Sequence, residues 1–166
     1  ILFTIASCAT NPHVGNSYYT QFALQYEKNS HYTTNYRKGI LLPINSEVKI
    51  KKMNKKSIVA EVVSLGQEIR IINVPKHTGQ NIDEAFDRIF AQTPKGLSGF
   101  SDLEKRNIKL GKVEKGMRKE AVIAAIGYPP QIETASLEAN EWTYWSARFN
   151  KFKVFFQDNK VTNVKN

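Results

Sequence analysis

Apolar and polar residues alternate over much of the first half of the chain, a pattern that is typical of half-buried β-strands. In the clearest run Val48, Ile50 and Met53 are apolar and lysines stand between them. Aromatic and β-branched residues dominate the other runs, and short turns separate them. The predicted strands cover residues 21–26, 32–36, 47–53, 58–64 and 69–74. Strands of this number and length predict a small antiparallel barrel or sandwich.

The spacing of apolar residues changes to a helical period in the second half. Residues 81–92 carry an amphipathic stripe, and Asn81 is placed to cap the first turn. Proline and glycines between Thr93 and Ser101 predict a linker, after which Ser101 is expected to cap a short helix through residue 107. The change of period predicts two modules that fold around separate cores.

The last part of the chain predicts one more helix followed by three strands. Residues 117–126 have apolar side chains along one face, Gly127 stands where a helix C-cap glycine belongs, and Pro129 prevents continuation. Strand-like runs follow at residues 141–146, 152–156 and 161–164. Helices packed on one side of an antiparallel sheet predict an α+β fold class.

Composition is that of an ordinary globular chain, with 41% hydrophobic and 23% charged residues. These values exclude wholesale disorder and a polytopic membrane protein. The 24 Lys and Arg residues exceed the 15 Asp and Glu residues, which gives a net charge of +9. A basic excess can favour nucleic acid, anionic lipid or acidic protein surfaces. Because no zinc-finger, helix-turn-helix or RNP-type motif accompanies the charge, no nucleic-acid partner is predicted.

The amino terminus carries the most informative local signal. Residues 1–7 are apolar and end in small residues, and Cys8, the single cysteine, follows directly. The tetrapeptide Ile-Ala-Ser-Cys at 5–8 resembles the lipobox of bacterial lipoproteins, in which the cysteine thiol carries the lipid. This resemblance implies that 1–7 are a signal-peptide remnant, that Cys8 is lipidated and that 8–17 form a short tether. Alanine after the cysteine favours the outer membrane; the alternative is a free cysteine on an apolar strand.

A second resemblance concerns the β-rich half. Residues 36–43, Tyr-Arg-Lys-Gly-Ile-Leu-Leu-Pro, resemble the opening segment of bacterial SH3-like modules. Together with the predicted strands, this resemblance implies an SH3-like β barrel with a trailing helix over 18–93.

A third resemblance is carried by an ordered set of residues near the end of the chain: Gly116, Met117, Val122, Gly127, Pro129, Trp142, Tyr144, Val154, Phe156 and Val161. This order resembles the BamE (SmpA/OmlA) family of outer-membrane lipoproteins. The resemblance implies a BamE-like module over 101–166, with two helices and a three-stranded antiparallel sheet. The chain departs from the family at Arg118 and Ala121, where a capping box is usual, and its absence is expected to lower local stability by about 1 kcal/mol.

Residues that could carry chemistry are sparse and far apart. His13, His31 and His77 have no second ligand at helical or turn spacing, and each is expected to be a solvated histidine. The sequence contains no serine-hydrolase elbow, zinc-protease motif or phosphate-binding loop. We therefore predict no catalytic, cofactor-binding or metal-binding residues and no enzymatic activity.

Aromatic residues are concentrated in the last strands. Because side chains alternate across a strand, Trp142 and Tyr144 are expected to face the helices, and Trp145 and Phe155 the opposite side. Trp145, Phe155 and Phe149 are the candidate partner-binding residues, since aromatics without helical cover often mark interfaces. The alternative is that loops cover them.

Together these expectations describe a lipoprotein on the periplasmic face of the outer membrane of a Gram-negative bacterium. Its expected role is non-catalytic: to scaffold or stabilise a larger complex of envelope proteins that serves assembly, secretion or motility. One alternative is an SH3-like lipoprotein that binds peptidoglycan or another wall ligand through lysines such as Lys51 and Lys55. Another is an inhibitor-like binder of an envelope enzyme.

Overall fold

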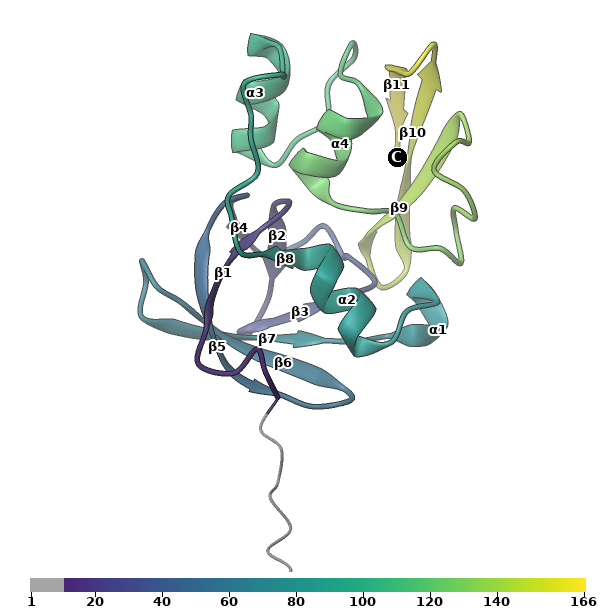
Figure 1. The fold of residues 1–166 in the computed structure, drawn as a ribbon. Coiled ribbons are helices and arrows are strands. Elements are labelled where there is room, and N and C mark those ends of the chain that lie inside the picture. The colour runs from purple at the N-terminus through teal and green to yellow at the C-terminus, as the bar shows by residue number, and fades with distance from the viewer. Residues whose placement is uncertain (1–10) are drawn as a thin grey trace, which may run out of the picture.

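The computed structural model describes residues 11–166, and the protein is α+β, as the sequence predicts. Two modules are stacked along the long direction of Figure 1. The lower module is rich in strands, and the upper module combines two helices with a small sheet.

A curled six-stranded sheet forms half a barrel in the β-rich module. Along the sheet its strands are β3 (Ser30–Tyr32), β7 (Gln67–Ile72), β6 (Ser57–Val62), β5 (Glu47–Met53), β1 (Ser17–Thr20) and β8 (Phe90–Ala91). A separate antiparallel pair consists of β2 (Leu24–Tyr26) and β4 (Ile40–Leu42). Because β3 and β7 run parallel, the six-stranded sheet is mixed, and the expectation of a purely antiparallel barrel is wrong.

Alternation along the central strands builds the core of this module. Val48 and Ile50 of β5 are fully buried, while the lysines between and after them are exposed. The predicted strand over 32–36 is wrong beyond Tyr32, because the chain turns there: the backbone N of Asn35 donates to Tyr32 O at 2.8 Å, and Asn35 has a φ of 63°.

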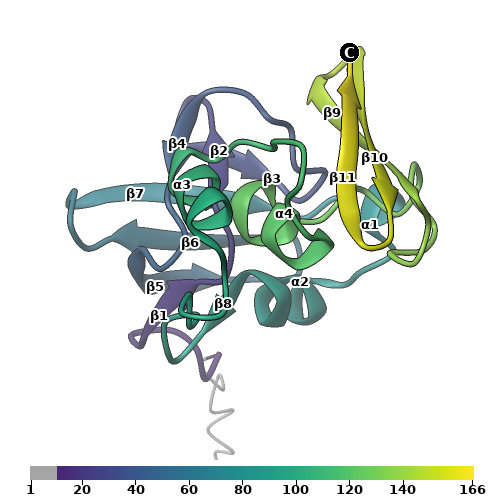
Figure 2. The same cartoon turned by 90° about the horizontal axis from the view of Figure 1, so that it is seen from above.

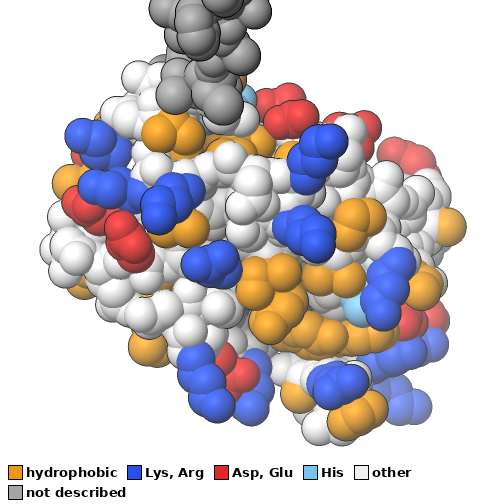
Figure 3. All heavy atoms as spheres, turned by 90° about the horizontal axis from the view of Figure 1, so that it is seen from below, with side chains coloured by type: hydrophobic (Ala, Val, Ile, Leu, Met, Phe, Trp, Pro, Cys, Tyr) orange, Lys and Arg blue, Asp and Glu red, His pale blue; other side chains and the backbone are white. Residues whose placement is uncertain are grey.

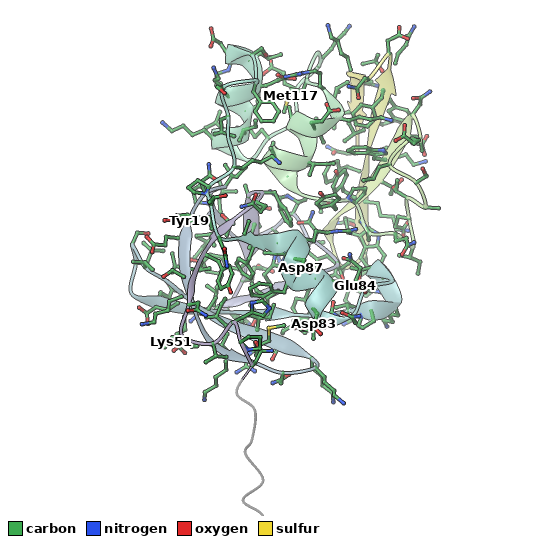
Figure 4. The ribbon with its side chains drawn as sticks, in the orientation of Figure 1. Tyr19, Lys51, Asp83, Glu84, Asp87 and Met117 are labelled. Carbon is green, nitrogen blue, oxygen red and sulfur yellow. The ribbon has the colours of Figure 1, made fainter. Side chains whose placement is uncertain are left out.

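Two helices follow β7: α1 (Pro75–Thr78), which the hydrophobic pattern does not predict, and α2 (Ile82–Ile89). Asn81 caps α2 as predicted. Its Oδ1 accepts hydrogen bonds from the backbone N of Asp83 (2.9 Å) and Glu84 (3.0 Å), and the Glu84 carboxylate accepts one from Asn81 N. Figure 4 labels these two acidic residues on α2, where both are exposed.

The second module consists of two helices and an antiparallel three-stranded sheet. Its elements are α3 (Asp102–Leu110), α4 (Lys119–Ile126), β9 (Glu141–Ala147), β10 (Asn150–Gln157) and β11 (Lys160–Lys165). The strand order is β11-β10-β9, and Figure 2 shows the two helices over the β-rich module with this sheet beside them. Trp142 and Tyr144 are fully buried, as predicted, and Met117 (labelled in Figure 4) belongs to the same core.

The start of α4 is held by an ion pair instead of a capping box. Arg118 is the N-cap residue and makes no side-chain cap, as the sequence predicts. Its backbone N and its Nε both donate to Glu104 Oε1 at 2.9 Å, and its Nη2 donates to Glu104 Oε2 at 2.8 Å. Glu104 also accepts a hydrogen bond from the backbone N of Ser101, the cap of α3. The Glu104 carboxylate, in a side chain only 3% exposed, therefore joins the two helices.

Residues 11–17 pack onto the β-rich module. The backbone N of Gly15 donates to Ile50 O at 2.8 Å. The ring of His13 stacks on that of Phe86 in α2, with 3.9 Å between the ring centroids. Backbone pairing and ring stacking therefore fix this segment against both β5 and α2.

The predicted amino-terminal features are only partly within the described residues. Cys8 and the predicted signal remnant 1–7 lie outside them. The predicted tether over 8–17 is wrong for residues 11–17, because these are hydrogen-bonded to the folded body.

Hydrogen bonds join the two modules, although each has its own hydrophobic core. Asn35 Nδ2 donates to the backbone carbonyls of Ile126 at 2.7 Å and Tyr128 at 2.9 Å. The predicted linker is also tied to the β-rich module, since Asn45 Nδ2 donates to Lys95 O and Lys95 N donates to Asn45 Oδ1. Apolar contacts also join them: Ile44 belongs to the core of the second module, and the rings of Phe22 and Tyr128 lie 5.7 Å apart.

Candidate binding groove between the two modules

A groove of about 870 Å³ lies where the two modules meet. One wall comes from β2, β3 and the loop after β3, and the other from α1 and the turn between β9 and β10. Figure 3 shows this region as a hydrophobic hollow beside a histidine, with Lys and Arg side chains around it.

Aromatic rings form an apolar surface inside the groove. The ring of Trp145 lies 5.6 Å from that of Tyr36 and 5.0 Å from the imidazole of His77, measured between centroids. Tyr32 packs edge-to-face against Tyr36 at 6.2 Å. Such side chains offer large contact areas at low conformational-entropy cost, because each has only two rotatable bonds.

Hydrogen bonds hold these rings in place. The carbonyl of Trp145 accepts a hydrogen bond from the backbone N of Arg37 at 2.9 Å, which attaches β9 to the β-rich module. His77 Nδ1 lies 2.7 Å from Thr34 Oγ1. Burial, and then the charge of Lys76, lower the pKa of His77 below its usual 6.5. This shift favours the neutral imidazole.

The groove is positively charged. Among the lining residues that the structure describes, three are cationic and one, Glu27, is acidic. Lys38 pairs with Glu27 at 3.2 Å, which leaves Lys76 and Arg148 without an acidic partner among residues 11–166. The Arg148 guanidinium instead lies 5.4 Å from the centroid of the Phe149 ring.

A buried guanidinium adds to this charge. Arg37 stands between the lining residues Tyr36 and Lys38, and its Nη1 donates to Ala23 O (3.1 Å) and Asn35 Oδ1 (3.2 Å). Burial lowers the pKa of Arg37 to about 10, so the group stays charged at pH 7. Within the described part of the chain no carboxylate forms an ion pair with it.

Three buried polar atoms in this region have no hydrogen-bond partner among the described residues. They are Gln25 Oε1, Arg37 Nη2 and Trp145 Nε1. Gln25 and Trp145 are lining residues of the groove. An unsatisfied buried polar group costs about 1–3 kcal/mol.

The three predicted partner-binding aromatics do not lie together. Trp145 and Phe149 both line the groove, and Phe149, on the β9–β10 turn, is 86% exposed. Phe155 lies farther along β10, opposite Glu141 and Asn163, and is not among the lining residues. Trp145 is partly covered by rings of the β-rich module, so covering loops account for part of its surroundings.

The contribution of the β-rich module to the groove is not predicted by the sequence. Gln25, Tyr36, Arg37 and His77 all belong to this module and none is among the predicted site residues. The aromatic and basic run at 36–38 is the one signal that could have drawn attention to them. Its contact with β9 depends on how the modules pack.

Other residues singled out in the sequence have structural roles. His31 is buried, so the expectation of a solvated side chain is wrong; its Nδ1 lies 2.8 Å from Gln25 O, and burial lowers its pKa to about 4. Lys51 (labelled in Figure 4) pairs with Glu61 at 3.1 Å. Over residues 11–166 there is no group of three or more potential metal ligands, and no helix is long and apolar enough to cross a membrane.

Comparisons with known proteins give no relative to this chain. No protein-family model, no curated protein and no solved structure matches it.

Proposed function

We propose that the protein is a non-catalytic cell-envelope lipoprotein that scaffolds or stabilises a membrane-associated protein complex by binding a partner in this groove. The observation that carries the proposal is the aromatic surface between the modules, where Trp145 of β9 meets Tyr36 and the exposed Phe149 stands at the adjoining turn. Aromatic residues in sheltered hollows are the ones that dominate protein–protein affinity.

The chemistry of the groove favours binding over catalysis. His77 and Thr34 are within hydrogen-bond distance, which is the geometry of a base and a nucleophile. Thr34 is only 1% exposed, however, so a substrate has no access to its hydroxyl. No carboxylate among the described residues is hydrogen-bonded to the imidazole to orient it as a base.

A lipid on Cys8 would hold the β-rich module close to the membrane. Cys8 stands three residues before Asn11, where the described and packed part of the chain begins. An extended chain spans at most about 3.6 Å per residue, so this distance is at most roughly 11 Å. The second module lies on the far side of the β-rich module from the end where the described chain begins (Figure 1), where it is available to proteins rather than lipid.

The architecture of the second module supports its resemblance to the BamE family, and this resemblance is one reason to propose an outer-membrane location. α3, α4, β9, β10 and β11 follow the order that the resemblance to the BamE family implies, and Met117, Trp142 and Tyr144 share one core. The strand number of the β-rich module supports an SH3-like barrel, although its parallel β3–β7 pair departs from an antiparallel one.

Site-specific crosslinking tests the docking function. A photo-crosslinking amino acid replaces Phe149 in the full-length protein in intact cells, and the same amino acid at Lys105, exposed on α3, is the control. We expect a discrete crosslinked envelope protein from position 149 and not from position 105. Identical patterns from both positions, or none from position 149, would contradict the proposal.

Membrane fractionation tests the anchor separately. Stable membrane attachment needs more than one acyl chain, since each buried CH₂ contributes only about 0.8 kcal/mol. We expect Cys8→Ser to move the protein from the membrane to the soluble fraction. A variant that stays in detergent-washed membranes would refute lipidation at this residue.

A further inference from the structure

The charge and the unpaired atoms of the groove indicate the kind of segment that it binds, an inference that rests on the proposed docking function. We propose that the groove binds an extended acidic segment of a partner protein. Its carboxylates pair with Lys76 and Arg148, and its apolar side chains lie on the rings of Trp145 and Tyr36.

Charge complementarity is the first argument. Lys76 stands on α1 and Arg148 on the β9–β10 turn, and neither has an acidic partner within residues 11–166. The buried Arg37 adds a third charge next to the lining residues, without a counter-ion among the described side chains. Opposite potentials across an interface accelerate association and exclude partners of the wrong charge. A carboxylate-bearing segment is therefore favoured over a basic one.

The unpaired atoms are the second argument, and they favour a polypeptide backbone. Gln25 Oε1 needs a donor and Trp145 Nε1–H needs an acceptor. Both atoms are buried, so a bound chain reaches them only after these two side chains rotate toward the groove; a peptide group, with one N–H and one C=O, then carries the matching partners. A flat anionic surface such as a bilayer cannot enter the hollow to provide such groups.

The arrangement of rings is the third argument, and it favours an extended conformation. Tyr32, Tyr36 and Trp145 follow one another across the groove at 5.6–6.2 Å between neighbouring centroids. Successive side chains of an extended chain point to opposite sides. Alternate residues can therefore contact the rings while the residues between them reach the cations on the rim.

Binding of designed probes to the full folded chain tests this proposal. The probes are short labelled peptides of alternating Glu and Phe, of alternating Lys and Phe, and of alternating Glu and Ser, measured by fluorescence anisotropy at low and physiological salt. We expect the Glu-Phe peptide to bind at least about tenfold more tightly than either other peptide. Its affinity is expected to fall as salt rises, since exposed charges are screened.

Two charge-reversal variants locate the binding surface. The double variant Lys76→Glu, Arg148→Glu is expected to weaken binding of the Glu-Phe peptide by about tenfold or more. The matched control is Lys105→Glu, Lys109→Glu, which makes the same charge change on the exposed face of α3. If the control variant binds the Glu-Phe peptide within about twofold of the parent protein, the loss in the first variant comes from charge in the groove and not from the change in net charge.

The possible results separate this proposal from the docking function. The proposal of an acidic segment is wrong if the protein binds the Glu-Phe and Lys-Phe peptides with equal affinity. It is also wrong if both double variants lose the same affinity for the Glu-Phe peptide. Displacement of the Glu-Phe peptide by purified peptidoglycan, lost in the Lys76→Glu, Arg148→Glu variant, also overturns it and identifies a glycan occupant. If crosslinks from position 149 are still found after one of these results, the groove binds a partner and only the preference for an acidic segment is wrong. If the crosslinks are also absent, the docking function and the acidic preference are both wrong.

Discussion

The buried carboxylate of Glu104 provides the sharpest prediction about stability. It accepts hydrogen bonds from Ser101 N, Arg118 N and the Arg118 guanidinium, so it ties the starts of α3 and α4 together. Glu104→Gln keeps the size of the side chain but removes its charge and one strong acceptor. We expect this change to loosen the second module while leaving its apolar core intact.

The magnitude follows from the pKa of the carboxyl group. Hydrogen bonds from the Arg118 side chain, followed by backbone hydrogen bonds, outweigh burial and lower the pKa of Glu104 from its ordinary 4.5 to about 2. At about 1.36 kcal/mol per pKa unit, this difference corresponds to roughly 3 kcal/mol of stability at neutral pH. Because 39% of the Arg118 side chain is exposed, solvent screens part of the interaction. The expected loss for Glu104→Gln is therefore about 2–3 kcal/mol.

The pH dependence has a defined sign. The folded-state pKa of Glu104 is lower than the unfolded value, so the ionised carboxylate stabilises the protein fully above about pH 4.5. This stabilisation is lost as the pH falls from 4.5 towards 2. The difference between the parent and Glu104→Gln should therefore shrink by about 2 kcal/mol between pH 7 and about pH 3.

Urea unfolding at both pH values measures this difference, and thermal melting at pH 7 gives a second estimate. A loss of 2–3 kcal/mol corresponds to a fall in Tm of about 5–10 °C for a chain of this size. Asp102→Asn, an exposed carboxylate in the same first turn, is the control and should cost about 0.3–1 kcal/mol. A Glu104→Gln difference that is equal at both pH values, or no larger than that of the control, would refute the reasoning.

Three further changes test other parts of the structure. Gly127→Ala should destabilise the protein by about 2–4 kcal/mol in urea unfolding, because φ is 77° there and a Cβ would lie 2.7 Å from the Phe22 ring; a loss under about 1 kcal/mol would contradict this packing. Trp142→Ala should cost about 3–5 kcal/mol, whereas Phe149→Ala should stay within about 0.5 kcal/mol, and similar melting temperatures for both would contradict their different burial. Burial lowers the pKa of His31 to about 4, so stability should fall as pH drops from 6.5 to 4; His31→Gln should remove that fall, and an unchanged pH profile would argue against it.

The elements that sequence predicts best are those with a strong local signal. Asn81 and Ser101 form capping boxes at the starts of α2 and α3, and Gly127 ends α4 as expected. Strand β5 has the predicted bounds, because alternation over seven residues is hard to mistake for another period. Trp142 and Tyr144 face the core because the order of side chains along a strand fixes which face each occupies.

Elements that depend on distant contacts are predicted less well. The predicted strand at 32–36 ignores the turn at Asn35, whose side chain bonds to carbonyls of Ile126 and Tyr128, more than ninety residues away. Residues 11–17 contain no apolar period, yet they are held by β5 and by Phe86. The local order of apolar and polar residues predicts neither of these contacts.

The sequence by itself determines the α+β class, most strands and helices, the two cores and the aromatic character of β9 and β10. Only the tertiary structure decides that Trp145 and Phe149 share a groove with Tyr36 and Lys76, and that Phe155 does not. The physical reason is that periodicity specifies which face of an element is buried against its own module. The position of one module on another depends on a few hydrogen bonds and ring contacts between residues far apart in the chain, such as the bond from Arg37 N to Trp145 O.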